Sequence, residues 1–455
     1  MMDLAFFARA GGGVLVGSNC ALTSISTDSR HIAPGALFVA IEGERFDGHD
    51  FVAAAFQAGA NAALVSTDRA QGLPMPRVVV ADPLRALGQC AAAWRAQFGL
   101  PLFGITGSNG KTTVKEMLAG ICRAAAGSAE AVLATEGNFN NHIGLPLTLL
   151  RLTEAHRYAV IEMGMNHSGE IALLTRLAAP TVALVNNAQR AHLAGLGSIE
   201  AVARAKGEIF EGLGPRGVGI INADDAYAEL WREQLGSRAS LSFGLRQGAD
   251  VFGRCSATAA GSRLRLQTPA GETEFDLQVP GEHNALNALA AAACALGAGI
   301  GLAPIAAGLR RFAGVPGRLQ NLAGPQGARL INDCYNANPD SIAAALAVLA
   351  ACSGRRILVL GDMGELGDGV DAMHVEVLRR AQMLGIDSVH LLGEAMRRAL
   401  GEAKLQGTAH ASAEALAQAV RAECDAHSTV LVKGSRFMRM ERVVALLAGR
   451  PQEGH

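Results

Sequence analysis

Short apolar runs alternate with longer amphipathic stretches along most of this chain. The runs are three to five residues long and are bounded by polar residues, whereas the stretches between them place apolar residues at helical spacing. Runs of this kind are typical of strands buried on both faces, and their alternation with helices indicates parallel sheets. The pattern therefore predicts an α/β protein.

The apolar runs fall into three blocks, which we expect to be domains: 1–97, 98–314 and 315–455. The chain length of 455 residues agrees with this number, because a domain typically takes about 150 residues. The first block holds expected strands at 37–40, 63–65 and 77–80 and helices at 51–58 and 84–98. The second holds strands at 102–105, 159–161 and 182–185. The third, with strands at 329–331, 357–360, 388–392 and 429–432, reads as a second doubly wound unit.

One apolar stretch, residues 284–309, carries no charge and is long enough to span a bilayer. It is mostly Ala and Gly, however, and Pro304 lies inside it. We therefore interpret it as two close-packed helices joined at residues 297–299, and we expect no membrane span. The apolar start, residues 1–17, lacks the early positive charge of a secretory signal.

Composition narrows the class of protein. The net charge of −1 gives no reason to expect nucleic acid as a partner. The eight cysteines are scattered and form no C-x-x-C pair, which fits a reducing cytoplasm and disfavours a disulfide framework or a zinc site.

The clearest chemical motif follows the expected strand at 102–105. The run Gly107-Ser108-Asn109-Gly110-Lys111-Thr112-Thr113 leads directly into a helical pattern at 114–121. Glycines let backbone N–H groups approach phosphate oxygens, the lysine reaches the β- and γ-phosphates, and the first threonine binds Mg²⁺. The strict pattern has Gly where this chain has Ile105, so an ordinary glycine-rich turn stays open on this motif alone.

Polar residues also follow other expected strands, at the sheet edge where α/β proteins bind ligands. Glu162 comes after 159–161, and His192 comes shortly after 182–185. Both are suitable ligands for Mg²⁺ beside a triphosphate, although Glu162 can equally cap a helix. By pattern alone, Lys206 is a solvated helical lysine and His283 is a helix cap, and loop carboxylates such as Asp333 are common.

Taken together, these motifs resemble the Mur ligase family of ATP-dependent amide-forming enzymes in peptidoglycan precursor synthesis. The resemblance covers nearly the whole chain and the family shares the departure at Ile105. The motifs that carry it, besides the phosphate loop, are residues 26–30, 34–38, 42–51, 135–141, 162–165, 203–210, 283–284, 332–341, 361–367 and 433–436.

The resemblance implies ATP and two Mg²⁺ ions as cofactors, and a carbamylated Lys206 that helps to hold the second ion. The metal ligands it implies are Thr112, Glu162, His192 and Lys206. The catalytic residues are Lys111, Lys206, His192 and Arg318. The ATP-binding residues are Gly107, Ser108, Asn109, Gly110, Lys111, Thr112, Thr113, His283, Asn284, Asn287, Arg318 and Asp333, with His283-Asn284 near the adenine and Asp333 near the ribose.

The substrate residues implied are Ser29, Arg30, Arg45, Asp47, Asn138, Asn140, Tyr335, Asn336, Asn338, Ser435 and Arg436. The Asp-Asn-Pro-Arg signature of the diaminopimelate- or lysine-adding branch is absent, whereas the run at 335–340 suits the dipeptide-adding branch. The expected partners are therefore UDP-N-acetylmuramoyl-tripeptide and D-alanyl-D-alanine, joined through an acyl phosphate. We expect a cytoplasmic monomer with a central phosphate-loop ATPase domain and a C-terminal Rossmann-like domain.

Two other functions are weighed against this one. Folylpolyglutamate synthetase shares the central block, but it needs no UDP-binding domain, and the motifs at 28–30 and 43–51 disfavour it. A regulatory NTPase switch would hydrolyse ATP without making an amide, and no partner-binding module is evident in the sequence.

Overall fold

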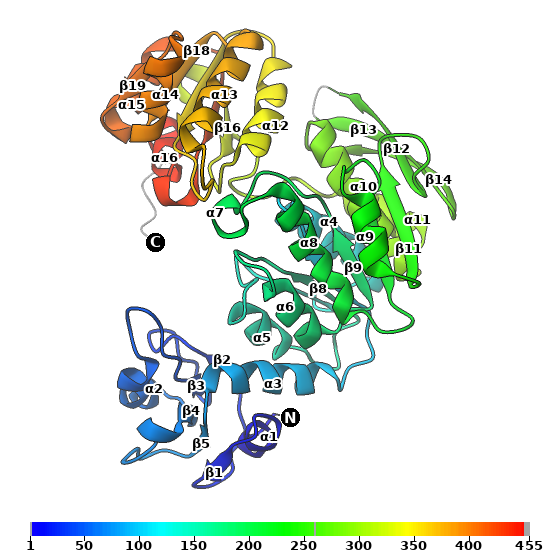
Figure 1. Ribbon diagram of the computed structural model, residues 1–455, viewed down its shortest axis with the longest axis vertical. Coiled ribbons are helices and arrows are strands. Elements are labelled where there is room, and N and C mark those ends of the chain that lie inside the picture. The colour runs from blue at the N-terminus through cyan, green and yellow to red at the C-terminus, as the bar shows by residue number, and fades with distance from the viewer. Residues whose placement is uncertain (1, 259–260, 450–455) are drawn as a thin grey trace.

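The computed structural model describes residues 2–258 and 261–449 and contains three sheets, each built from one part of the chain (Figure 1). The sheets follow one another along the long axis of the molecule, with the N-terminal unit at one end and the C-terminal unit at the other. The predicted three-unit α/β architecture is confirmed.

The first unit is a five-stranded sheet in the order β1-β5-β4-β3-β2. Its strands are β1 (Val14–Val16), β2 (Ile25–Ser26), β3 (Leu37–Val39), β4 (Ala62–Ser66) and β5 (Arg77–Val80). Its helices are α1 (Leu4–Ala10), α2 (Val52–Gln57) and α3 (Pro83–Arg95), with short 3₁₀ turns η1 (Gly48–Phe51) and η2 (Thr67–Arg69). The predicted strands and helices are confirmed, and β1 adds an antiparallel edge that its short pattern did not reveal.

The central sheet has nine strands in the order β14-β13-β12-β11-β10-β9-β6-β8-β7. The parallel strands are β6 (Leu102–Thr106), β7 (Val132–Ala134), β8 (Tyr158–Glu162), β9 (Val182–Val185), β10 (Val218–Asn222) and β11 (Ala239–Gly244). Their helices are α4 (Lys111–Ala126), α5 (Gly144–Leu149), α6 (Glu170–Ala178), α7 (Leu193–Leu196), α8 (Ile199–Gly207), η3 (Glu208–Gly212) and α9 (Ala228–Leu235).

An antiparallel extension of the central sheet was missed by the sequence analysis. It consists of β12 (Val251–Ala257), β13 (Ser262–Thr268) and β14 (Gly271–Leu277). Its strands alternate buried and exposed residues, so they lack the continuous apolar runs by which the other strands were found. In β13, for example, Leu264 and Leu266 are buried while Arg263 and Arg265 are exposed.

The uncharged stretch 284–309 forms two helices, as predicted: α10 (Glu282–Gly297) and α11 (Leu302–Arg310). Both pack against α4 in the central unit, and small alanine side chains allow this close approach. Within the described ranges, no helix combines the length and the hydropathy that a membrane span requires.

The third unit is a six-stranded sheet in the order β15-β16-β20-β17-β18-β19, parallel except for its edge strand β15. The strands are β15 (Gln320–Ala323), β16 (Arg329–Asp333), β17 (Arg356–Gly361), β18 (Ser388–Leu392), β19 (Thr408–His410) and β20 (Thr429–Lys433). The helices are η4 (Pro325–Gly327), α12 (Pro339–Ala350), α13 (Val370–Met383), α14 (Glu394–Ala403), α15 (Ala413–Glu423), η5 (Arg436–Met438) and α16 (Glu441–Ala448). The predicted doubly wound unit is confirmed.

The two joints between the units differ in chemistry. One apolar core runs from the first unit into the central unit, because α3 packs on α5 and α6 and places Leu87 in the same cluster as Leu145 and Ile171. The apolar clusters of the third unit, by contrast, include no described residue before Leu319. The first joint is therefore held by hydrophobic burial, and the second is held by polar contacts.

The shared core predicts that the first two units unfold together. Leu87→Ala removes a fully buried side chain, which typically costs about 2–5 kcal/mol. We expect one shifted denaturation midpoint for both units, followed by the fluorescence of Trp94 in the first unit and Trp231 in the central unit. Unfolding of the first unit while the Trp231 transition stays in place would contradict a shared core; Trp94→Phe isolates the second signal.

Candidate active site

The motif at 107–113 has the geometry of a phosphate loop between β6 and α4. Gly110 precedes the first residue of α4 with φ +82°, and a Cβ there would lie 2.3 Å from Asn287 Oδ1, so the position requires glycine. The Lys111 ammonium donates to the carbonyls of Gly107, at 2.8 Å, and Ser108, at 3.3 Å. The lysine thus lies across the loop, where phosphate oxygens would bind.

The segment that follows β9 holds this loop in shape. Asn109 N donates to Asn187 Oδ1 at 2.9 Å, and Asn187 Nδ2 donates back to Asn109 O at 3.0 Å. Ser108 N also donates to Asn187 O at 3.0 Å. One asparagine side chain therefore satisfies both backbone polar groups of a loop residue, as a neighbouring strand would. The loop backbone is thus held in shape by contacts within the protein itself.

A second constellation lies at the start of α4. The Thr112 hydroxyl donates to Glu162 Oε2 at 2.9 Å and accepts from Arg318 Nη2 at 2.9 Å. The other oxygen of Glu162 accepts from Asn140 Nδ2 at 2.7 Å. Glu162 lies at the end of β8 and caps no helix, so the capping alternative is wrong. Hydroxyl, carboxylate and guanidinium thus meet at the phosphate loop.

Lys206 lies near this constellation, in the last turn of α8. Only 1% of the residue is exposed, and it forms no ion pair within the part of the chain that the structure describes. Burial, together with the positive charge of Lys111, holds its pKa well below the ordinary value for lysine. The interpretation of Lys206 as a solvated helical lysine is therefore wrong.

His192 connects the central unit to the third. It has a positive φ of 59°, and its Nδ1 lies 3.0 Å from Glu365 Oε2. Burial lowers the pKa of the imidazole, although the nearby Glu365 carboxylate opposes this shift. The close contact with His192 in turn lowers the pKa of Glu365.

The phosphate loop, Glu162, His192 and Arg318 line one cleft of about 630 Å³ between the central and third units, whereas Lys206 does not lie on the wall of this cleft. Its wall includes the following predicted site residues: Ser108, Asn109, Gly110, Lys111, Thr113, Asn138, Asn140, Glu162, His192, His283, Asn284, Asn287, Arg318, Asp333, Tyr335, Asn336 and Asn338. Gly107 and Thr112 lie just behind this surface, in contact with Lys111 and with Glu162. The phosphate loop and the third unit therefore face the same space.

One end of the cleft is formed by α10 and by the carboxyl ends of β16 and β20 in the third sheet. Lys433 Nζ donates to Asp333 Oδ2 at 2.6 Å and to the carbonyl of Asn336 at 2.9 Å. His283 lies beside this pair on the cleft wall, half-buried, and desolvation lowers its pKa to about 4 despite the attraction of Asp333. The imidazole is therefore neutral near pH 7. Asn284 donates to the carbonyl of Pro280.

The expected amine-site residues divide into two groups. The Tyr335 ring lies under the Arg318 guanidinium, 4.2 Å from it, and Asn338 caps α12 while pairing with Asn109. Ser435 is 3% exposed, and its hydroxyl bonds Gly364 N and Ala337 O. Arg436 pairs with Glu441 away from the cleft. The roles of all these residues in binding an amine stay predictions.

The expected substrate residues of the first unit lie outside the cleft wall. Arg30 and Arg45 are exposed, Ser29 is partly exposed, and Arg30 pairs with Asp28. The Asp47 carboxylate accepts from the backbone of His49 and contacts its imidazole at 2.6 Å. Asp47 thus organises its own loop, and contact of these residues with a substrate stays a prediction.

Two cleft residues, Asn187 and Lys433, and the neighbouring Arg190 were not assigned roles from the sequence. Asn187 was noted only as a strand-end residue, and Lys433 only as part of a motif. Arg190, which pairs with Asp340 and Glu376, carried no signal because its partners lie 150 and 186 positions away.

Three family models match consecutive parts of the chain. The Mur ligase family catalytic domain matches residues 21–95, the Mur ligase middle domain matches 105–295, and the Mur ligase glutamate ligase domain matches 317–436.

Individual relatives match over nearly the full length. The UDP-N-acetylmuramoyl-tripeptide–D-alanyl-D-alanine ligase of Escherichia coli K12 is 44% identical over 96% of each chain. A crystal structure of MurF from Acinetobacter baumannii has a TM-score of 0.91, 36% identity and 98% coverage of each chain. MurF ligase from Thermotoga maritima, solved in complex with ADP, has a TM-score of 0.83 and 26% identity, covering 94% of this chain and 97% of that one.

The depressed pKa of His283 predicts a loss of stability in acid. An unfolded histidine takes up a proton as the pH falls below its ordinary pKa of 6.5, whereas the folded His283 does so only near pH 4. The free energy of unfolding therefore falls between these values, and His283→Gln should fall less steeply there. Melting temperatures from pH 7.5 to 4 test this; identical slopes for both proteins would contradict a neutral imidazole with a lowered pKa at this position.

Proposed function

This chain belongs to the Mur ligase family, and we propose that it joins D-alanyl-D-alanine to UDP-N-acetylmuramoyl-tripeptide at the expense of ATP. The observation that carries this proposal is the single cleft in which a phosphate loop faces Tyr335, Asn336 and Asn338 of the third unit. The full-length match to the Escherichia coli ligase supports the choice of substrates.

The three units suggest a division of labour, with boundaries near residues 97 and 314. In this proposal the first unit holds the UDP end of the substrate through Ser29, Arg30, Arg45 and Asp47. The central unit binds ATP, and the third unit completes the ATP site and binds the dipeptide. Asn138 and Asn140 lie on the cleft wall and would face the tripeptide.

The proposed reaction has two steps. A carboxylate oxygen of the tripeptide attacks the γ-phosphorus of ATP, the bond to the β-phosphate oxygen breaks, and ADP leaves. The neutral amine of D-alanyl-D-alanine then attacks the acyl carbon, loses a proton, and expels inorganic phosphate. Lys111 and Arg318 stabilise the charge on the transferred phosphoryl group, and the ordered loop amides position it.

The residues of the cleft fit Mg²⁺ bound together with ATP. Thr112 and Glu162 would hold one ion, and His192 with Lys206 would hold a second; the metal supplies charge neutralisation of the phosphates. No group of three His, Cys, Asp or Glu side chains in the described ranges is arranged to hold a metal ion by itself. This suits Mg²⁺, which takes most of its ligands from phosphate and water.

We also propose that Lys206 is carbamylated. Its ammonium is buried without a counter-ion among the described residues and its pKa is strongly lowered, so the neutral amine is favoured. The amine nitrogen then attacks CO₂ and loses a proton, which yields a carbamate anion. The new negative charge offsets Lys111 nearby and provides oxygen ligands for the metal.

The proposed setting is a cytoplasmic monomer. All eight cysteines, which lie in the described ranges, are free thiols, as expected in a reducing compartment.

The N-terminal unit is the feature that distinguishes the alternatives. Residues 21–95 match the Mur ligase family catalytic domain, and in this proposal they hold the UDP end of the substrate, a function that folylpolyglutamate synthetase does not need. A hydrolytic switch would release phosphate from ATP without any amine.

Amine selectivity tests the proposed function. A site built to pair the amide and terminal carboxylate of a dipeptide leaves its own groups unpaired with free D-alanine, which typically costs about 10⁴-fold in kcat/KM or more. We expect ATP-dependent product only with D-alanyl-D-alanine at saturating UDP-tripeptide. Lys111→Ala is the matched inactive control and should lose about 10²–10³-fold or more. Comparable kcat/KM for a single amino acid would assign the chain to another branch, and phosphate release that needs no amine would favour a switch.

The carbamate predicts dependence on CO₂. Lys206→Ala should abolish ligation with little loss of stability, and a small carboxylic acid such as acetate should restore part of the activity. The wild-type enzyme should lose activity in CO₂-depleted buffer and regain it with bicarbonate. Full activity of Lys206→Ala would contradict a role for Lys206 in the metal site. Loss of activity in Lys206→Ala, together with a wild-type enzyme whose activity does not depend on CO₂, would show that the lysine acts without carbamylation.

A further inference from the structure

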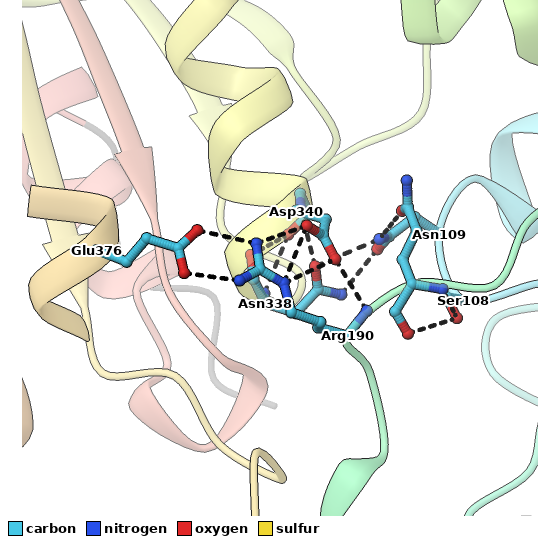
Figure 2. A network of polar contacts seen from close by, with 8 residues as sticks. Ser108, Asn109, Arg190, Asn338, Asp340 and Glu376 are labelled. Carbon is cyan, nitrogen blue, oxygen red and sulfur yellow. Dashed lines mark hydrogen bonds and ion pairs between the residues drawn. The ribbon is translucent and has the colours of Figure 1, made fainter. Parts of the chain in front are cut away.

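Arg190, which follows β9, is one point at which the third unit is fastened to the central unit. Its guanidinium donates to Asp340 from Nε, at 3.1 Å, and from Nη2, at 2.7 Å, and its backbone N–H donates to the same carboxylate at 2.8 Å. Nη1 and Nη2 of the same guanidinium donate to the Glu376 carboxylate at 2.7 and 3.0 Å. Figure 2 shows the guanidinium between the two carboxylates. Every nitrogen of this side chain thus binds the third unit.

Both carboxylates lie on rigid elements. Asp340 is the second residue of α12, after Pro339, and Glu376 lies within α13. The start of α12 is fixed further by a capping box, in which Asn338 and Ser341 bond each other's backbone N–H groups. A fork-shaped contact to two helices of one unit fixes the orientation of that unit as well as its distance.

The start of α12 also contacts the phosphate loop directly. Asn338 Nδ2 donates to Asn109 Oδ1 at 2.9 Å, and Asn109 Nδ2 lies 3.3 Å from Asn338 Oδ1. The cap of α12 and the loop residue thus form a reciprocal amide pair across the joint between the units (Figure 2).

Gln189, the neighbour of Arg190, completes the connection. Its backbone N–H donates to Ser108 Oγ at 2.9 Å, and the same hydroxyl donates to the Gln189 carbonyl at 3.2 Å. Its side-chain oxygen accepts from Asn109 Nδ2 at 2.6 Å. The segment 189–190 therefore holds the phosphate loop with one residue and the third unit with the next.

We propose that Arg190 is a positioning residue: with Asp340 and Glu376 it latches α12 onto the phosphate loop, so that the loop's affinity for ATP depends on the docked third unit. The joint has no shared apolar core among the described residues to replace this contact. The Arg190 side chain is 24% exposed and that of Asp340 is 25% exposed, so solvent screens this pair less than a surface ion pair. The kinetic part of the inference rests on the proposed function, but the docking does not.

The chain offers a matched control. Arg356 has a side chain 23% exposed and forms a forked pair with Asp387, but both residues belong to the third unit. Arg190→Gln and Arg356→Gln therefore remove the same chemistry from a joint and from within a unit. Circular dichroism and melting curves establish that each variant is folded before it is compared.

The experiment measures docking and binding separately on the full chain. Small-angle scattering without ligands should show a larger radius of gyration for Arg190→Gln only. Its Kd and KM for ATP should rise about tenfold or more, the loss typical of a partly buried hydrogen-bonded charge pair. The Kd for UDP-tripeptide should stay within about twofold, because its proposed UDP site lies in the first unit. Arg190→Lys, which keeps the charge but not the fork, should fall between.

Coupling to the partners sharpens the result. Glu376→Gln should reproduce part of the effect, and the double variant with Arg190→Gln should add little to Arg190→Gln alone. Equal scattering and equal ATP affinity in Arg190→Gln and Arg356→Gln would overturn the latch. A larger particle with unchanged ATP affinity would overturn its link to the phosphate loop. If the wild-type protein does not ligate, the proposed function is wrong, but the scattering and ATP-binding results still test the latch. The failure of one proposal can therefore be distinguished from the failure of the other.

Discussion

The fixed shape of the phosphate loop is the constraint on which the rest of the site depends. A loop can bind phosphate tightly only if its N–H groups are aimed before the ligand arrives, because ordering a flexible loop consumes binding free energy. Asn187 provides this order because its side chain bonds both the backbone N–H and the backbone carbonyl of Asn109. The position of Asn187 is set in turn by β9, which pairs directly with β6, the strand that leads into the loop. The sheet therefore aims the loop.

The two joints between the units differ in chemistry, and they therefore differ in how easily the units they connect can separate. Hydrophobic burial between the first and central units is non-directional and strong, and it holds the two units as one body. The second joint consists of amide pairs, ion pairs and the Arg318–Thr112 contact. Polar contacts of this kind exchange readily with water, so the third unit can separate at modest cost. Such a joint suits an enzyme that must admit ATP and an amine and then exclude water from an acyl phosphate.

Much of the fold was predictable because buried parallel strands are written as continuous apolar runs. The strand–loop–helix around Lys111 was predictable as well, because the apolar strand, the glycine-rich loop and the helical pattern follow one another directly in the sequence. Lys206 shows where local pattern stops: in sequence it is one charged residue of the amphipathic helix α8, and its burial arises only from packing against the rest of the unit. Arg190 is similar, because its partners are brought to it by the docking of another sheet. Strand β13 was missed because its residues alternate between buried and exposed, so it contains no continuous apolar run of the kind that revealed the other strands.

Several positively charged side chains lie in or near the cleft, partly or fully removed from water, which is electrostatically unfavourable. Burial lowers the pKa of both Lys111 and Lys206; Arg318 adds to the shift of Lys111, Lys111 adds to that of Lys206, and the Glu162 carboxylate opposes the shift of Lys111. Removing cations from water is unfavourable unless anions accompany them. A triphosphate and the proposed carbamate on Lys206 would supply such anions. The same positive charge would stabilise the charge that develops on the transferred phosphoryl group.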